Sequence, residues 1–198
     1  MSAHALRLSQ DEYLAIERAA PFRSEYFNGR MYAMAGGSYR QAVVINNLAF
    51  ALRIDLANRR CQVTTSDVRV RVDPGGLYTY PDVVVVCGEP LYADSHRDTI
   101  LNPVFIVEVL SPSTEAYDRG FKSAQYRSMA SLQEFALVSQ AEPRIEIFRR
   151  RPEGGWFFTE AAGLEAVGRI ESIACTLPLA AVYENVAFGG EDEADPRP

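Results

Sequence analysis

Chemistry is first suggested by Glu108, which stands inside the apolar run FIVEVL at 105–110. An ionised carboxylate in an apolar strand costs several kcal/mol unless it is paired with a cation or bound to a metal. A second acid, Asp82, opens the apolar run DVVVVC at 82–87. If the two runs form neighbouring strands, their carboxylates repel each other unless a cation lies between them. Hard oxygen ligands of this kind suit Mg²⁺ or Mn²⁺.

A polar stripe follows in a predicted helix at 113–130. Asp118, Lys122 and Tyr126 recur every four residues, so they share one helix face, and Gln125 lies beside them. A short Ser-Pro-Ser link joins this helix to the preceding apolar run. The stripe could therefore pack back across the acidic strand and reach its carboxylate.

A plainer interpretation of these residues stays open. In it, Asp82 caps a turn after proline and Glu108 pairs with a lysine. Asp118 and Lys122 then form an ordinary surface ion pair, which contributes about 0.3–0.5 kcal/mol.

Several local patterns predict the elements that must position these groups. Ser9 and Glu12 form a capping box for a helix at about 10–20, and Asn28-Gly29 is typical of a tight hairpin. Ser38 begins a long helix, and the later sequence is dominated by short apolar strands. We expect an α+β (mixed α/β) fold with a central mixed sheet flanked by helices, and with an N-terminal helix and hairpin. The expected domain spans 1–188, and an acidic, disordered tail occupies 189–198.

Composition narrows the class of protein. The chain has 198 residues, of which 47% are hydrophobic and 23% charged, as in an average globular domain. It has no apolar run long enough for a transmembrane helix and no secretory signal, so no membrane partner is expected. Three widely spaced cysteines indicate reduced thiols and a cytoplasmic location. His4 and His96 are the only histidines, which excludes histidine-rich metal motifs.

Net charge weakly disfavours a nucleic-acid partner. The charge is −6, but residues 191–198 hold four acids and one arginine, so the remaining chain carries −6 + 3 = −3. Basic clusters remain at 58–60 and 148–151.

Three motifs together resemble a known family. They are SEYFNGRMYAMAGGS at 24–38, YPDVVVV at 80–86 and PVFIVEVLSPSTEAYDRGFKSAQY at 103–126. They are similar to the PD-(D/E)XK nuclease superfamily and, more narrowly, to its Uma-two family of restriction-endonuclease-like proteins. The resemblance runs from about residue 25 to residue 138 and implies a restriction-endonuclease-like core with metal-dependent phosphodiester cleavage.

The resemblance also implies roles for individual residues. Asp82 and Glu108 would bind Mg²⁺, with Mn²⁺ as the alternative. The superfamily's usual lysine position holds Leu110, and Lys122 of the following helix would take its place. Glu25 would be an additional acid near the metal.

Three further residues are expected to line the site by the same resemblance. They are Gln125, Tyr126 and Gln41. Gln41 stands close to the place where the family often has a histidine, and glutamine cannot titrate near neutral pH.

The expected function is a Mg²⁺-dependent endonuclease that acts on DNA, as a homodimer if it makes paired cuts in a duplex. Three rivals remain: a catalytically silent nucleic-acid-binding module, a hydrolase of small phosphoesters, and an assembly protein whose polar stripe only stabilises packing. The retained trio of Asp82, Glu108 and Lys122 argues against a silent module. Binding of a long polyanion should weaken steeply with salt, whereas binding of a small substrate should not.

Overall fold

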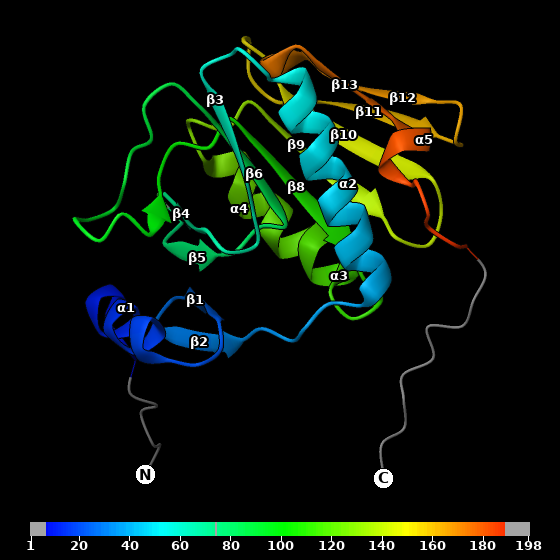
Figure 1. Ribbon diagram of the computed structural model, residues 1–198. Coiled ribbons are helices and arrows are strands. Elements are labelled where there is room, and N and C mark those ends of the chain that lie inside the picture. Colours follow the sequence, from blue (N-terminus) through cyan, green and yellow to red (C-terminus); the bar gives the residue numbers. More distant parts are fainter. Residues whose placement is uncertain (1–6, 74, 189–198) are drawn as a thin grey trace, which may run out of the picture.

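A six-stranded mixed sheet forms the centre of the computed structural model, which describes residues 7–73 and 75–188 (Figure 1). The predicted acidic tail at 189–198 lies outside the described residues. The strand order is β11-β10-β9-β8-β6-β3, in which β8 and β9 are parallel and the other pairs antiparallel. The strands are β3 (Cys61–Thr65), β6 (Val83–Cys87), β8 (Phe105–Leu110), β9 (Glu134–Ser139), β10 (Arg144–Arg150) and β11 (Trp156–Ala162). The predicted mixed α+β class is confirmed.

The two continuous apolar runs form the centre of this sheet because both of their faces are covered. Val83 and Val107 face a cluster that includes Leu48 and Leu52, whereas Ile106 on the other face packs beneath the later helices. Each fully buried leucine of this kind stabilises the fold by about 1.5–3 kcal/mol.

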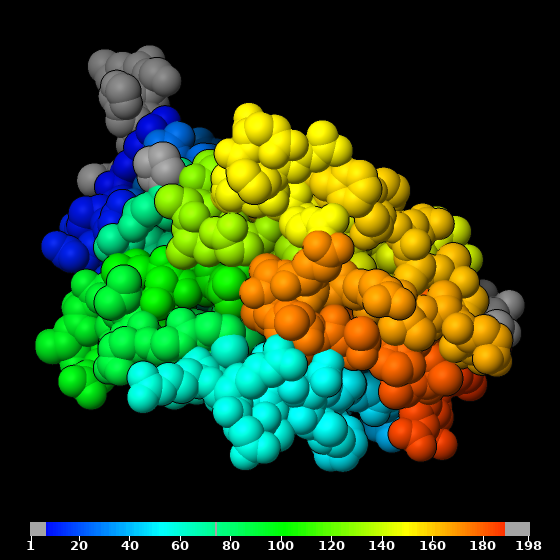
Figure 2. Space-filling view, turned by 90° about the horizontal axis from the view of Figure 1, so that it is seen from above, coloured from blue at the N-terminus to red at the C-terminus, as the bar shows by residue number. Residues whose placement is uncertain are grey.

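Helix α2 (Tyr39–Asp55) covers one face of the sheet and begins at its N-cap Ser38, as predicted. It also contacts the C-terminal segment, which lies beside it in Figure 2. The segment forms two paired strands, β12 (Val167–Ile170) and β13 (Cys175–Pro178), with the short helices η2 (Glu171–Ile173) and α5 (Leu179–Val182).

A second, five-stranded sheet has the order β2-β1-β5-β4-β7. Its strands are β1 (Ser24–Phe27), β2 (Arg30–Ala33), β4 (Arg69–Val72), β5 (Leu77–Thr79) and β7 (Thr99–Ile100). Asn28 and Gly29 turn the β1–β2 hairpin with positive φ angles, which glycine adopts without strain. Helix α1 (Gln10–Ala19) has the predicted capping box and packs Tyr13 against Tyr26 with their rings stacked.

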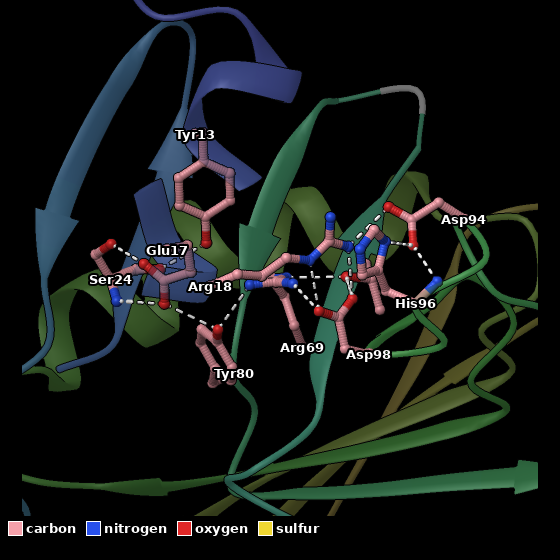
Figure 3. A network of polar contacts seen from close by, with 10 residues as sticks. Tyr13, Glu17, Arg18, Ser24, Arg69, Tyr80, Asp94, His96 and Asp98 are labelled. Carbon is pink, nitrogen blue, oxygen red and sulfur yellow. Dashed lines mark hydrogen bonds and ion pairs between the residues drawn. The ribbon is translucent and has the colours of Figure 1, made fainter. Parts of the chain in front are cut away.

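Polar contacts fasten α1 to this sheet (Figure 3). The buried carboxylate of Glu17 accepts hydrogen bonds from the Ser24 amide and the Tyr80 hydroxyl, both at 2.9 Å. Arg69 donates to the same hydroxyl and pairs with Asp98 at 2.9 Å. These contacts hold the start of β1 in place because Ser24 is its first residue.

The crossover between parallel strands β8 and β9 contains the predicted helix, but the helix is interrupted. It forms α3 (Glu115–Tyr117), a π-helical turn η1 (Asp118–Lys122) and α4 (Ser123–Ser128). Parallel strands require such a crossover, which returns the chain across the sheet. The polar stripe of Asp118, Lys122 and Tyr126 therefore lies over β8.

The cysteine prediction is wrong for two of the three residues. Cys61 and Cys87 stand opposite each other on the antiparallel strands β3 and β6 and form a disulfide. Cys175 is free and buried. Sequence spacing could not show this disulfide, because the pairing of the two cysteines depends on strand register.

The cytoplasmic location stays a prediction. Among the described residues, no helix is long and apolar enough to cross a membrane.

Candidate active site

Strand register places the two predicted acids opposite each other. Val83 pairs with Val107 in the antiparallel β6–β8 ladder, so Asp82, one residue earlier, faces Glu108, one residue later. Directly opposed residues point to the same face of a sheet. The Val109 amide donates a 2.7 Å hydrogen bond to Oδ2 of Asp82, which holds that carboxylate at the end of β8.

Lys122 extends into the same place from the crossover. Its Nζ lies 3.1 Å from Oε1 of Glu108, 3.1 Å from Oε1 of Glu25 and 3.4 Å from Oδ1 of Asp118. The residue is only 5% exposed. The alternative of a surface Asp118–Lys122 ion pair is therefore wrong, because both residues are buried in a network.

The π-helical turn lets the stripe residues face inward together. It spans Asp118 to Lys122, and the Ser123 hydroxyl donates to the Asp118 carbonyl at 2.7 Å. Such turns occur frequently at functional sites. One turn later, the hydroxyl of buried Tyr126 donates to Oε1 of Glu108, the same oxygen that Lys122 contacts.

Glu25 comes from a different sheet. It lies in β1, and the Thr79 hydroxyl from β5 donates to its Oε1. The Tyr117 hydroxyl donates to Oε2 at 2.9 Å. The family resemblance predicted Glu25 as a site residue. It did not predict Thr79 or Tyr117, because neither is one of the acidic or lysine positions of the family motifs.

The two glutamines are placed differently. Gln41, in the first turn of α2, donates from Nε2 to the Val109 carbonyl at 3.0 Å, beside the amide that holds Asp82. Gln125 points away from the acids and toward Gly75. Its Oε1 lies so close to the Gly75 backbone that a Cβ atom added to Gly75 would be only 2.0 Å from it. It therefore lies against the β4–β5 turn and does not line the cavity described below.

Carboxylates outnumber cations here. Those of Glu25, Asp82, Glu108 and Asp118 lie around the one ammonium of Lys122. Such an excess of buried negative charge favours the uptake of a proton or of a further cation.

The pKa values reflect this excess. Burial, opposed by Lys122 and reinforced by Asp82, raises the pKa of Glu108 to about 8. Burial raises the pKa of Asp82 to about 6, although the Val109 amide opposes it, and burial also raises the pKa of Asp118. Burial disfavours the Lys122 ammonium, but the carboxylates outweigh it, Glu108 first, and hold the pKa of Lys122 well above its usual range.

The donor set fits a hard divalent cation. In the described part of the chain, no group of three or more histidine, cysteine, aspartate or glutamate side chains is arranged to hold a metal. Mg²⁺ does not require one, because it takes one or two carboxylates and completes its octahedron with water and substrate oxygens. Asp82 and Glu108, opposed on one face, supply such a pair.

These groups open into a cavity of about 1190 Å³. It lies between the β1–β2 hairpin and the crossover, and its lining includes the four acids and Lys122. Six aromatic side chains are also part of its lining. They are Phe22, Phe27, Tyr32, Tyr80, Tyr117 and Phe121. No sequence motif indicated these six aromatic residues as a group, because they come from separate elements.

The amino-acid sequence is similar to a known protein family and to two known proteins. The profile of the Uma2 family, described as "Putative restriction endonuclease", matches residues 10–178. Two uncharacterized proteins of Synechocystis sp. are similar: slr1290 is 34% identical over 94% of this chain and 97% of its own length, and sll1609 is 33% identical over 80% and 90%.

A solved structure shares the architecture. The crystal structure of "a putative nuclease belonging to DUF820" from Anabaena variabilis superposes with a TM-score of 0.71, at 15% identity, over 89% of this chain and 97% of that one. This likeness confirms the predicted restriction-endonuclease-like fold. The matches to the family profile and to the Synechocystis proteins span most of the sequence, and the chain belongs to the Uma2 family.

Proposed function

We propose that this protein is a Mg²⁺-dependent nuclease that hydrolyses phosphodiester bonds of DNA, with Mn²⁺ as an alternative metal. The observation that carries the proposal is the opposed pair Asp82 and Glu108 on one sheet face, with buried Lys122 beside it in an open cavity. Family membership and the nuclease fold support it.

The metal is assigned to Asp82 and Glu108. When bound there, a divalent cation would stabilise negative charge on the phosphate and acidify a water molecule. Asp82 is held for this purpose by the Val109 amide, and Glu108 is oriented by Tyr126 and Lys122.

Lys122 has a charge-stabilising role in this proposal. Hydrolysis builds negative charge on the phosphoryl and leaving oxygens, and an ammonium held in a fixed position beside them stabilises that charge. In the metal-free protein the surrounding carboxylates raise the pKa of Lys122 and favour its protonated form, which is the form that a charge-stabilising donor requires. Glu25 and Asp118 fix its position from two sides.

The experiment is cleavage of plasmid and oligonucleotide DNA with Mg²⁺, with Mn²⁺ and with EDTA. The wild-type protein should cleave with either metal and not in EDTA, and Glu108→Gln should be inactive. Glu165→Gln, which changes an exposed glutamate outside the cavity, is the matched control and should keep full activity. Binding of DNA without cleavage under all conditions would instead favour the silent binding module.

Two smaller expectations accompany this proposal and stay predictions. One is the homodimer, which light scattering of the purified protein tests. The other is the cytoplasmic location.

A further inference from the structure

We propose that the nuclease acts on single-stranded DNA, whose bases stack on an aromatic wall made of Phe22, Tyr32, Tyr117 and Phe121. The inference rests on the proposed function and adds the substrate class. Three features carry it: the depth of the reactive groups, the exposure of the aromatic rings, and the charge of the cavity.

The reactive groups lie at the floor of the cavity. Glu108 is 3% exposed and Lys122 is 5% exposed, and Glu25 and Asp118 are also buried. A phosphodiester must therefore enter the cavity to meet them. The bases next to that phosphodiester can stack on aromatic side chains only if they are not already stacked and paired in a duplex. A single strand meets this condition.

The aromatic wall is open to solvent beside this floor. Phe22, in the loop after α1, is 58% exposed, Tyr32 in β2 is 48% exposed, and Tyr117 in α3 is 37% exposed. All three line the cavity, from both of its sides. Exposed apolar surface that borders a cavity marks a binding site. Flat aromatic faces stack with any base.

One side of the wall is rigid. Tyr117 stacks on Phe121 with ring centroids 5.4 Å apart, and Phe121 meets the edge of Phe27 at 4.7 Å. The Tyr117 hydroxyl is bound to Glu25, so the ring directly adjoins the acidic floor. The Nζ of Lys122 lies 5.8 Å from the centroid of the Tyr117 ring, so a base bound beside this ring would lie close to Lys122.

The charge of the cavity disfavours a duplex. Its described lining has six acids and only two basic residues, Arg23 and Lys122. Arg23 is already paired with Asp67. Binding of a duplex rests on contacts between its phosphates and basic residues, whereas binding of a single strand also gains from each base that stacks on an aromatic ring. With at most two phosphate contacts, the slope of log K against log salt should be no steeper than about −1.4 for a single strand.

The experiment measures binding and cleavage separately. Fluorescence anisotropy in EDTA compares a labelled oligothymidylate with a hairpin duplex of equal length, over a range of salt concentrations. The single strand should bind at least about tenfold more tightly. Phe22→Ala and Tyr32→Ala should each weaken its binding about 5-fold to 150-fold, as expected for one stacked base. Tyr32→Phe should retain binding, because the ring is preserved.

The matched control is Phe50→Ala on α2, which removes a ring that is 67% exposed but lies outside the cavity. It should bind as the wild-type protein does. Equal or tighter binding of the duplex, or unchanged affinity in both wall variants, would overturn the inference. Mg²⁺-dependent cleavage of a duplex that is insensitive to the wall variants would do so while leaving the nuclease proposal intact. Stacking-dependent binding of the single strand without cleavage in any metal would support the inference and remove the nuclease proposal.

Discussion

Replacing Glu108 by glutamine should stabilise the metal-free protein at alkaline pH and not at acidic pH. Burial raises the pKa of this carboxyl from its ordinary value of 4.5 to about 8. A group with a raised pKa binds its proton more tightly in the folded state. The stability it contributes is therefore complete below pH 4.5 and is lost as the pH rises through 8.

The size of the effect follows from the same pKa values. Each change of one in a pKa corresponds to about 1.4 kcal/mol of folding free energy. The rise in the pKa of Glu108 from 4.5 to about 8 therefore corresponds to at most about 5 kcal/mol of stability. Glutamine cannot ionise, yet its carbonyl oxygen can still accept hydrogen bonds from Tyr126 and Lys122. Glu108→Gln should match the wild-type protein near pH 4.5 and exceed its stability by several kcal/mol at pH 8.

Urea denaturation in EDTA at pH 5 and at pH 8 measures this difference. Glu165→Gln, at an exposed position, is the control and should follow the wild-type profile. The reasoning is refuted if Glu108→Gln is the less stable protein at pH 8. That result would mean that the Glu108–Lys122 ion pair outweighs burial and stabilises the fold.

Addition of Mg²⁺ should narrow the difference in stability between Glu108→Gln and the wild-type protein. A ligand that binds only the folded state stabilises it by about 2.7 kcal/mol at a hundred times its Kd. The wild-type protein should gain this stability, whereas Glu108→Gln should gain much less. Equal gains would remove Glu108 from the metal site.

Four further outcomes are expected. Lys122→Ala should reduce single-turnover cleavage about tenfold to a thousandfold, with incomplete rescue by Lys122→Arg; equal rates would exclude the lysine from catalysis. The same variant should lose about 3–5 kcal/mol of stability at pH 7 because buried carboxylates lose their cation, and unchanged urea unfolding would contradict this. Under non-reducing conditions, Cys61→Ser should unfold with a free energy about 3.5 kcal/mol lower than that of the wild-type protein, since the disulfide closes a loop with a sequence separation of 26. Reduction of the wild-type protein should lower its free energy of unfolding by the same amount, which would confirm the disulfide as the cause. Glu17→Ala should lower the free energy of unfolding by about 2–5 kcal/mol, because three buried donors of Ser24 and Tyr80 lose their acceptor. A change below about 0.5 kcal/mol in thermal unfolding would show that the network of Figure 3 does not hold α1 to the sheet.

Local signals in the sequence were sufficient for most helices and strands. Ser9 with Glu12, and Ser38, satisfy the first free amides of α1 and α2, and such caps act within one turn. Continuous apolar runs indicated β6 and β8, because only strands covered on both faces need them. The four-residue spacing of Asp118 and Lys122 correctly placed them on one face, since helical periodicity is also local.

The site itself depended on contacts between distant parts of the chain. Register alone brings Asp82 opposite Glu108, and a one-residue slip would turn either carboxylate to the other face. The contact between Glu25 and Lys122 joins strand β1 of the second sheet to the β8–β9 crossover, and no local pattern in the sequence encodes a contact between such distant segments. The disulfide between Cys61 and Cys87, and the aromatic wall, have the same origin. Their members meet because the hydrophobic faces of separate elements pack together, and that packing is a property of the whole chain.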